Sequence, residues 1–209
     1  MLNKSQDVSV LDSIFILVES LIYITFIIFD IKNIDSTLIK YLGIVCCLIY
    51  ALINKNRYSI TAMVFTTIAD FFLLVINKYY EVGVFVFIFA QIAYLYYLGN
   101  FNNKGNKAFF ALRCLFIGLA IIYLFLNNLN QLLNVLTTIY FTNLIFNFIQ
   151  SLYNKQYLLA LGFILFICCD ICVGLNNILP YNKLINIGMW IFYLPSQVLI
   201  NLSIKNSTN

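Results

Sequence analysis

The sequence predicts an all-α integral membrane protein with eight transmembrane helices. The chain of 209 residues is 63% hydrophobic and only 10% charged, whereas soluble domains are about 45–50% apolar and about 25% charged. Apolar runs of about 16–21 residues recur between short polar breaks, and a helix needs roughly 20 residues to cross the hydrocarbon core. Lipid offers no partners to backbone N–H and C=O groups, so these runs are expected to be helical.

The polar breaks divide the chain into its expected elements. The first apolar run lacks a small-residue cleavage pattern, so it is expected to remain as a span. Asn-rich breaks such as NKNRY, GNFNNKGNKA and LNNLNQ separate later runs and suit short connectors. We therefore expect one polytopic membrane domain over residues 1–209. Its predicted spans are 12–29, 37–53, 59–76, 83–98, 108–126, 131–150, 157–174 and 184–203.

Lys and Arg residues are expected to set the orientation. Eight spans place both termini on one side, which collects Lys4, Lys55, Arg57, Lys104, Lys107, Arg113, Lys155 and Lys205, while the other side collects Lys32, Lys40, Lys78 and Lys183. Because cytoplasmic loops carry an excess of Lys and Arg, both termini are expected in the cytoplasm, with the protein in the plasma membrane if it is bacterial. The net charge of +4 is too modest to indicate nucleic-acid binding.

Acidic side chains inside apolar runs are the strongest functional signal. Asp70, Asp170 and Glu19 each interrupt such a run, and a carboxylate in hydrocarbon costs several kcal/mol unless it is paired, hydrated or protonated. Asp70 and Asp170 lie about 11 and 13 residues into spans that cross in the same direction, so their depths should be similar. We expect both acids to face a shared, lipid-accessible cavity. Glu19 either joins that site or is a lone protonated acid.

Two such carboxyl groups can divide an acid role and a base role between them. This division suits cleavage through an oxocarbenium-like state, and it equally suits proton-coupled transport. A protonated, packed carboxyl group is the structural alternative for either Asp. The Gln and Tyr residues of the spans have an alternative role as interhelical hydrogen-bonding groups.

The segments that follow the two Asp residues are similar. Gly83, Gln91 and Tyr94 follow Asp70, whereas Gly188, Tyr193 and Gln197 follow Asp170. This similarity suggests a four-plus-four parallel repeat, with coincidence in a biased composition as the alternative.

Cysteine and histidine usage limits the available chemistry. All six Cys residues lie in apolar stretches and are expected to be buried packing residues, the alternative being a metal or redox site at Cys168, Cys169 and Cys172. The chain has no His, which excludes Cys/His zinc sites and His-dependent nucleophile dyads. We expect neither a metal nor an organic cofactor.

Four segments, taken in order, resemble the YhhN-like lysoplasmalogenase family: YSITAMVFTTIADFFLLV, GVFVFIFAQIAYLYYL, LGFILFICCDICVG and IFYLPSQVLINLS. The resemblance covers residues from about 40 to 203 and implies eight spans. Characterised members hydrolyse the vinyl ether of lysoplasmalogens to a fatty aldehyde and a glycerophospho-alcohol. The resemblance therefore implies a lysophospholipid substrate taken from the bilayer.

The resemblance also assigns roles to individual residues. It places Asp70 and Asp170 on the family's two acidic, catalytic positions, and Tyr94, Tyr193 and Gln197 on its polar partners. Lys40 falls near a Lys-Pro pair of the family's second span, although Tyr41 stands where Pro would be. Lys40 and Glu19 are further candidates for substrate contact, and Lys40, Lys78 and Lys183 are the only candidates for a phosphate contact.

The chain departs from the family pattern at three positions. Gln91 stands where many members have His, Ala69 replaces Gly, and Cys169 replaces Ser. The loss of His removes a proton donor or headgroup contact, so Gln91 is either a substitute that binds substrate or the mark of altered activity. The alternatives to a hydrolase are a proton-coupled transporter of small molecules or lipids, and a catalytically silent lipid-binding relative.

Overall fold

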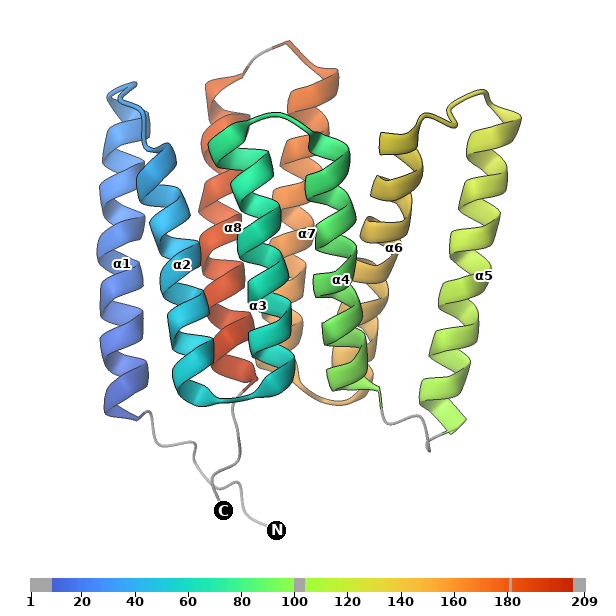
Figure 1. Cartoon of the computed structure of the whole chain (residues 1–209), viewed down its shortest axis with the longest axis horizontal. Helices are drawn as coiled ribbons and strands as arrows, with labels where there is room; N and C mark the ends of the chain where they lie inside the picture. The colour runs from blue at the N-terminus through green and yellow to red at the C-terminus, as the bar shows by residue number, and fades with distance from the viewer. Residues whose placement is uncertain (1–8, 100–103, 181, 205–209) are drawn as a thin grey trace.

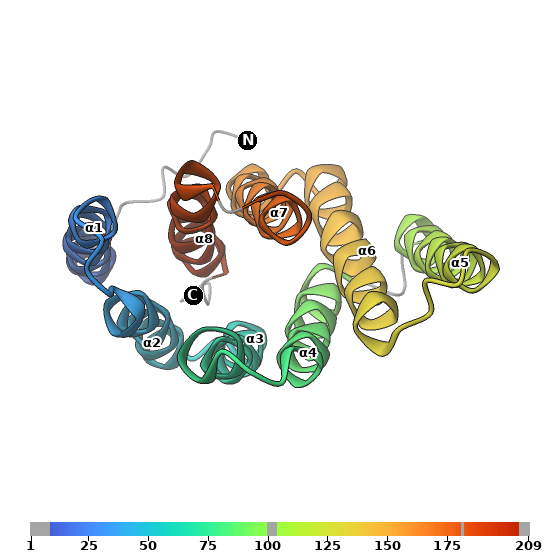
Figure 2. The same ribbon diagram turned by 90° about the horizontal axis from the view of Figure 1, so that it is seen from above.

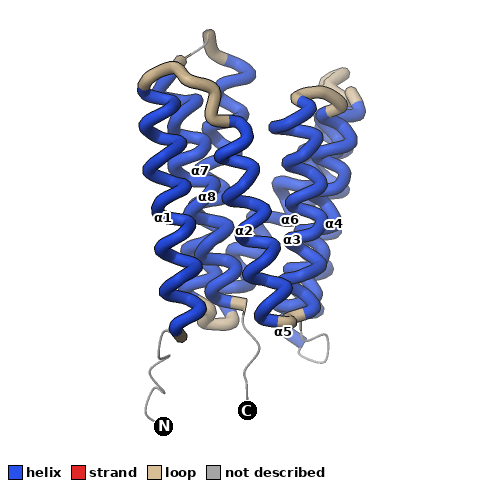
Figure 3. Tube along the Cα trace, turned by 60° about the vertical axis from the view of Figure 1, so that its left-hand side comes forward, coloured by secondary structure: helices blue, strands red, loops and turns tan. Residues whose placement is uncertain are grey.

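A computed structural model describes residues 9–99, 104–180 and 182–204, and Figure 3 shows helices and loops throughout these residues. The helices are α1 (Val10–Ile31), α2 (Thr37–Asn54), α3 (Arg57–Asp70) with its continuation η1 (Phe71–Ile76), α4 (Tyr80–Leu98), α5 (Lys104–Leu126), α6 (Leu132–Tyr153), α7 (Tyr157–Ile178) and α8 (Lys183–Ser203). With α3 and η1 taken together, eight segments of the described chain are long and apolar enough to cross a membrane. The predicted fold class is confirmed.

The helix bounds differ from the predicted spans by a few residues. The largest differences are at α5, which begins at Lys104 rather than at 108, and at α7, which continues to Ile178 rather than ending at 174. Both extensions consist of residues that helices accept but that hydropathy alone does not assign to a span. Lys4 and Lys205 of the predicted charge asymmetry lie outside the described residues.

Side-chain caps explain where several helices begin. Ser9 and Asp12 form a capping box at the start of α1, and Asn56 and Asn182 accept backbone N–H groups at the starts of α3 and α8. These caps satisfy donors that have no partner within the helix. They define where these three helices begin.

Pro195 lies inside α8. Proline has no N–H, so the carbonyl group of Ile191, four residues earlier, loses its helical partner. The hydroxyl of Tyr23 on α1 donates to that carbonyl oxygen at 3.5 Å. A neighbouring helix thus supplies a donor where the proline removes one, as transmembrane helices require.

The third span changes its helical geometry at Asp70. The α-helix ends at this residue and continues as the π-helix η1. A π-helical segment is rare and is frequent at functional sites. Hydropathy predicts that the span continues, but it does not predict this change.

Figure 2 shows the arrangement of the helices seen from above. Helices α1, α2, α3, α4, α6, α7 and α8 form a closed series of neighbours, and α5 packs outside this ring against α6. The first residue of α1 and the last residue of α8 lie at the same end of the bundle, whereas the α1–α2, η1–α4 and α7–α8 connections lie at the other (Figure 1). We call this second end the loop end. The four-plus-four repeat stays a prediction.

Candidate functional site

Asp70 is buried at the junction of α3 and η1, with 5% of its surface exposed. The hydroxyl of Tyr193 on α8 donates to Asp70 Oδ2 at 2.5 Å. Two residues that the sequence singles out, 123 positions apart, therefore form one contact. A hydrogen bond of this kind offsets part of the cost of burying the carboxyl group.

Asp170 has an equivalent partner from a different helix. It is half-buried on α7, and the hydroxyl of Tyr140 on α6 donates to its Oδ2 at 2.8 Å. Sequence reasoning missed Tyr140, because the chain contains 15 Tyr residues and nothing in the spacing distinguishes this one.

The two tyrosine–aspartate pairs lie beside each other. The ring of Phe166 contacts the ring of Tyr193 at 5.3 Å and that of Tyr140 at 6.3 Å between centroids. Asp70 and Asp170 are close enough to interact electrostatically. The structure thus places near each other the two acids that the sequence predicts to share a cavity, and we call Asp70, Asp170, Tyr140 and Tyr193 the acid cluster.

The depths of the two acids agree. Asp70 is as far along the chain from Arg57, the first residue of α3, as Asp170 is from Tyr157, the first residue of α7. At 1.5 Å per residue each acid lies about 20 Å from the beginning of its helix. The acid cluster is therefore nearer to the loop end of the bundle.

Gln197 on α8 is fully buried, and neither its amide nitrogen nor its amide oxygen has a hydrogen-bond partner among the described residues. It lies one helical turn from Tyr193, which contacts Asp70, and one turn from Asn201, which accepts from Ser59 Oγ at 3.0 Å. These two contacts with α3, at Asp70 and at Ser59, flank Gln197 along α8.

Tyr94 on α4 is the second buried group with unused hydrogen-bonding capacity. Its hydroxyl lies near Thr66 Oγ1, one turn below Asp70 on α3, but neither oxygen makes a hydrogen bond of good geometry to a described residue. A buried polar group without a partner costs about 1–3 kcal/mol. Tyr94, Thr66 and Gln197 are thus buried polar groups whose free hydrogen-bonding capacity water or a polar ligand would satisfy.

Gln91 is also on α4, but it contacts a different part of the molecule. Asn147 of α6 donates to its side-chain oxygen at 2.9 Å and to its backbone oxygen at 3.0 Å. The amide nitrogen of Gln91 has no partner among the described residues. No hydrogen bond joins Gln91 to the acid cluster within the described chain.

Arg113 belongs inside the bundle, and counting it among the orientation-setting charges was wrong. It lies on α5 with 2% of its surface exposed, and its guanidinium donates to Asn143 Oδ1 at 3.0 Å, Asn147 Oδ1 at 2.9 Å and Gln150 Oε1 at 3.3 Å. The sequence does contain a signal for this site, since the three amides lie on one face of α6.

Glu19 does not bond to the acid cluster in the described chain. Its Oε1 accepts from the thiol of Cys47 on α2 at 3.5 Å, and its Oε2 has no partner among the described residues. Cys47 is close enough to both Glu19 and Asp70 to interact with them electrostatically. Glu19 is therefore separated from the acid cluster by one side chain, that of Cys47.

Lys40 lies towards the loop end and forms an ion pair with Asp30 at 2.8 Å. Its ammonium group lies over the rings of Trp190 and Phe26, at 5.1 and 5.7 Å from the centroids. Lys183 donates to the backbone oxygen of Ile31 and to Asn33. Lys40, one of the candidates for a phosphate contact, is thus buried beside Trp190. The ring of Trp190 in turn contacts that of Tyr193, with 5.3 Å between the ring centroids.

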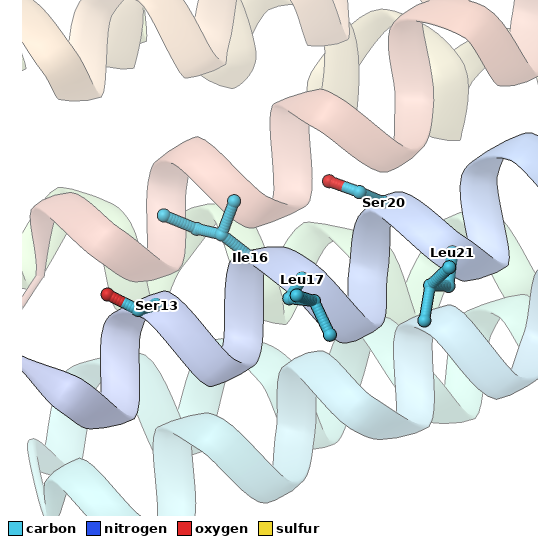
Figure 4. Close-up of a pocket in the computed structure, with 5 residues that line it drawn as sticks. All are labelled: Ser13, Ile16, Leu17, Ser20 and Leu21. Carbon is cyan, nitrogen blue, oxygen red and sulfur yellow. The ribbon is translucent and has the colours of Figure 1, made fainter.

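Two hollows in the described structure lie outside the acid cluster. One, of about 530 Å³, lies along α1 and is lined by Ser13, Ile16, Leu17, Ser20 and Leu21, all from that helix (Figure 4). The other, of about 350 Å³, lies at the loop end. Neither is lined by Asp70 or Asp170, so a lipid-accessible cavity at these acids stays a prediction.

Within the described residues, no group of three or more Cys, Asp or Glu side chains is placed to hold a metal ion, and all six cysteines are free thiols. Cys168, Cys169 and Cys172 lie along α7 next to Asp170. Cys169, which is buried, interacts electrostatically with both acids. It is therefore a packing neighbour of the acid cluster.

Comparison with known proteins gives one match. The model of the YhhN family matches residues 36–204, which include α2 to α8 and every residue of the acid cluster. No curated protein and no solved structure matches the chain significantly.

Proposed function

The chain belongs to the YhhN family, and from this premise we propose that it is a membrane hydrolase that cleaves the vinyl ether bond of lysoplasmalogens. The products are a fatty aldehyde and a glycerophospho-alcohol. The observation that carries the proposal is the acid cluster. In this cluster two carboxyl groups on membrane-spanning helices each accept a hydrogen bond from a tyrosine hydroxyl, and they are close enough to interact electrostatically.

The proposed reaction begins with a proton. A carboxylic acid of the pair donates it to the alkene carbon remote from the ether oxygen, which converts the vinyl ether into an oxocarbenium ion. The second carboxylate stabilises this cation and orients a water molecule. Water adds to the cationic carbon and gives one proton to the carboxylate that supplied the first proton. The resulting hemiacetal then breaks its bond to the glycerol oxygen, while its hydroxyl proton passes through the second carboxylate to that oxygen. The aldehyde leaves, and both carboxyl groups return to their starting states.

Tyr193 and Tyr140 hold the carboxyl groups in place for these steps. Each tyrosine is a hydrogen-bond donor to one acid, and it fixes the orientation of the oxygen that accepts or delivers the proton. Tyr94 and Gln197 have unused polar groups one turn below and would bind water or the glycerol portion. Neither a metal ion nor an organic cofactor takes part in the proposed steps.

Aldehyde release tests the proposal directly. We expect purified protein in detergent to release one aldehyde per glycerophospho-alcohol from a 1-alkenyl lysolipid and none from the matched 1-alkyl lysolipid, which cannot be protonated at carbon. The detergent removes any transport requirement. Absence of aldehyde from the alkenyl substrate would contradict the proposal, and a gain of aldehyde on Gln91→His would identify a silent relative.

A further inference from the structure

Helix α1 is held firmly to one of its neighbours, α2. Near the loop end, Lys40 of α2 pairs with Asp30 of α1 at 2.8 Å. Near the opposite end, the Tyr50 hydroxyl of α2 donates to Asp12 Oδ1 at 2.6 Å, and the ring of Tyr50 stacks on that of Phe15 with 4.0 Å between centroids. Helices α1 and α2 are therefore joined at both ends of the bundle.

The contact between α1 and its other neighbour, α8, is weaker. At the loop end, Lys183 donates to the backbone oxygen of Ile31 at 3.0 Å. Further along, among the residues that the structure describes, the two helices are joined by one long hydrogen bond of 3.5 Å, from the Tyr23 hydroxyl to the Ile191 oxygen. Of the neighbouring pairs in the ring, α1 and α8 pack least extensively. We call their boundary the α1–α8 seam and this bond the seam hydrogen bond.

The seam hydrogen bond lies where α8 is least rigid. Pro195 supplies no N–H to the Ile191 carbonyl group, so the acceptor of the seam hydrogen bond has no donor within its own helix. Proline inside a helix is also a usual site of bending. Ile191 is 38% exposed, which places this contact on the lipid-facing side of the seam. Loss of a single long hydrogen bond therefore frees α8 from α1 next to its proline.

The larger hollow lies on the α1 side of the seam. Its lining residues are all exposed and all come from α1: Ser13, Ile16, Leu17, Ser20 and Leu21. In Figure 4 the side chains of Ser13, Ile16 and Ser20 point towards the ribbon of α8. Residues three apart share a face of a helix, so Tyr23 follows Ser20 on this face. The hollow thus ends beside the seam hydrogen bond.

Behind the seam, a continuous run of aromatic rings leads to the acid cluster. The ring of Phe26 contacts that of Tyr23 at 5.2 Å and that of Trp190 at 6.4 Å between centroids. Trp190 contacts Tyr193, whose hydroxyl donates to Asp70. Separation of α1 from α8 would therefore open an apolar path from the lipid to a catalytic acid.

The depths of these features suit a lipid with one chain. At 1.5 Å per residue Tyr23 lies about 20 Å from the beginning of α1, as Asp70 does from the beginning of α3. The hollow extends from Tyr23 back to Ser13, about 5 Å from the beginning of α1. A lipid of the leaflet at the loop end has its headgroup at that end, so its hydrocarbon chain points along the hollow.

We propose that the α1–α8 seam is the site at which a single-chain lipid docks and enters the ring from the leaflet at the loop end. Its chain lies in the hollow along α1, and its polar end lies at the depth of the seam hydrogen bond. When this bond breaks, the linkage between chain and headgroup moves past Trp190 to Asp70. The identity of the lipid as a lysoplasmalogen rests on the proposed function.

The single Trp of the chain, Trp190, reports on this site because it lies behind the seam. We would place the full chain in phosphatidylcholine nanodiscs and add a 1-alkyl lysophosphoethanolamine with a dibrominated chain, which has no vinyl ether to hydrolyse and quenches Trp fluorescence on contact. A dibrominated two-chain phosphatidylcholine at the same mole fraction measures quenching by the surrounding lipid. We expect saturable quenching by the lysolipid that exceeds quenching by the two-chain lipid. Equal quenching by the two lipids would overturn the docking site.

Filling the hollow should weaken binding of the lysolipid. Ser20→Leu places a larger apolar side chain in the hollow, and we expect the affinity to fall by about fourfold or more, the equivalent of lost contact with one methylene group. Gly118→Leu is the matched control, since Gly118 lies on α5 and a Cβ atom there meets nothing within 4 Å. An unchanged affinity in Ser20→Leu, or an equal fall in both variants, would contradict the assignment of the chain to the hollow.

Removing the seam hydrogen bond should speed exchange without changing affinity. Tyr23→Phe keeps the ring and removes the hydroxyl. We expect quenching, and its recovery after a chase with unbrominated lysolipid, each to become about threefold faster, because opening of the seam limits both and an interhelical hydrogen bond contributes about that factor. Tyr123→Phe is the control at an exposed tyrosine of α5. Rates in Tyr23→Phe equal to those of the control would overturn entry through the seam.

These measurements do not depend on catalysis. Selective quenching without aldehyde release would keep the docking site and remove the proposed hydrolysis. Aldehyde release with unselective quenching would remove the docking site and keep the hydrolysis.

Discussion

At the scale of single residues, the acids could be found from the sequence, but their hydrogen-bond contacts with tyrosine could not. Asp70 and Asp170 stand out because a charged group inside an apolar run is expensive. Tyr140 does not stand out, because tyrosine is common in this chain and only tertiary packing decides which hydroxyl meets a carboxyl group. Tyr193 was found through its place in the resemblance, and its contact with Asp70 required the fold.

Removing one tyrosine hydroxyl should slow the reaction without unfolding the protein. We expect Tyr193→Phe and Tyr140→Phe each to lower kcat about tenfold, because each carboxyl group loses the donor that orients it. Tyr123→Phe is the control, since Tyr123 is an exposed tyrosine on α5. Steady-state aldehyde release gives the rates, and unchanged rates in both cluster variants would contradict the positioning role.

At the scale of helices, hydropathy predicts the spans well because burial in lipid is a property of whole segments. It does not predict how the segments contact one another. It predicts neither the π-helical turn after Asp70 nor the contacts with α6 that bury Arg113. For the same reason, the sequence predicts that Arg113 sets the orientation in the membrane, whereas in the structure Arg113 joins α5 to α6 by hydrogen bonds.

Close contact between α7 and α8 depends on Gly162. A Cβ atom there would lie 2.7 Å from Ile200 Cγ1 and 3.2 Å from the backbone oxygen of Ser196. Gly162→Ala should therefore reduce stability by about 1–3 kcal/mol, the usual cost of overpacking. Gly174→Ala on the same helix meets nothing within 4 Å and should be neutral or slightly stabilising. Thermal unfolding in detergent compares them, and equal effects would contradict the close packing.

Arg113 should hold α5 against α6. Arg113→Met leaves three carboxamide oxygens without their donor, and we expect a loss of about 2 kcal/mol or more. Arg57→Met is the control at an exposed arginine and should change stability by less than about 0.5 kcal/mol. Chemical unfolding in detergent provides the comparison. A more stable Arg113→Met protein would show instead that burying the cation is a net cost.

At the scale of the whole molecule, the ring of helices explains how distant segments build one site. Helices α3 and α7 place their acids at equal depth, while α6 and α8 supply the tyrosines. The loop end carries the smaller hollow and the opposite end carries the first residue of α1 and the last residue of α8. We propose that the latter end faces the cytoplasm, which agrees with the excess of Lys and Arg predicted there.

The central claim is that Asp70 and Asp170 act together on one vinyl ether. The most direct measurement is aldehyde release from a lysoplasmalogen by Asp70→Asn and Asp170→Asn, with thermal unfolding as the check on folding. Glu81→Gln is the control, since Glu81 is an exposed acid in the first turn of α4. We expect each Asp variant to lose at least about 100-fold in kcat while the control keeps full activity. Full turnover by either folded Asp variant would contradict the claim.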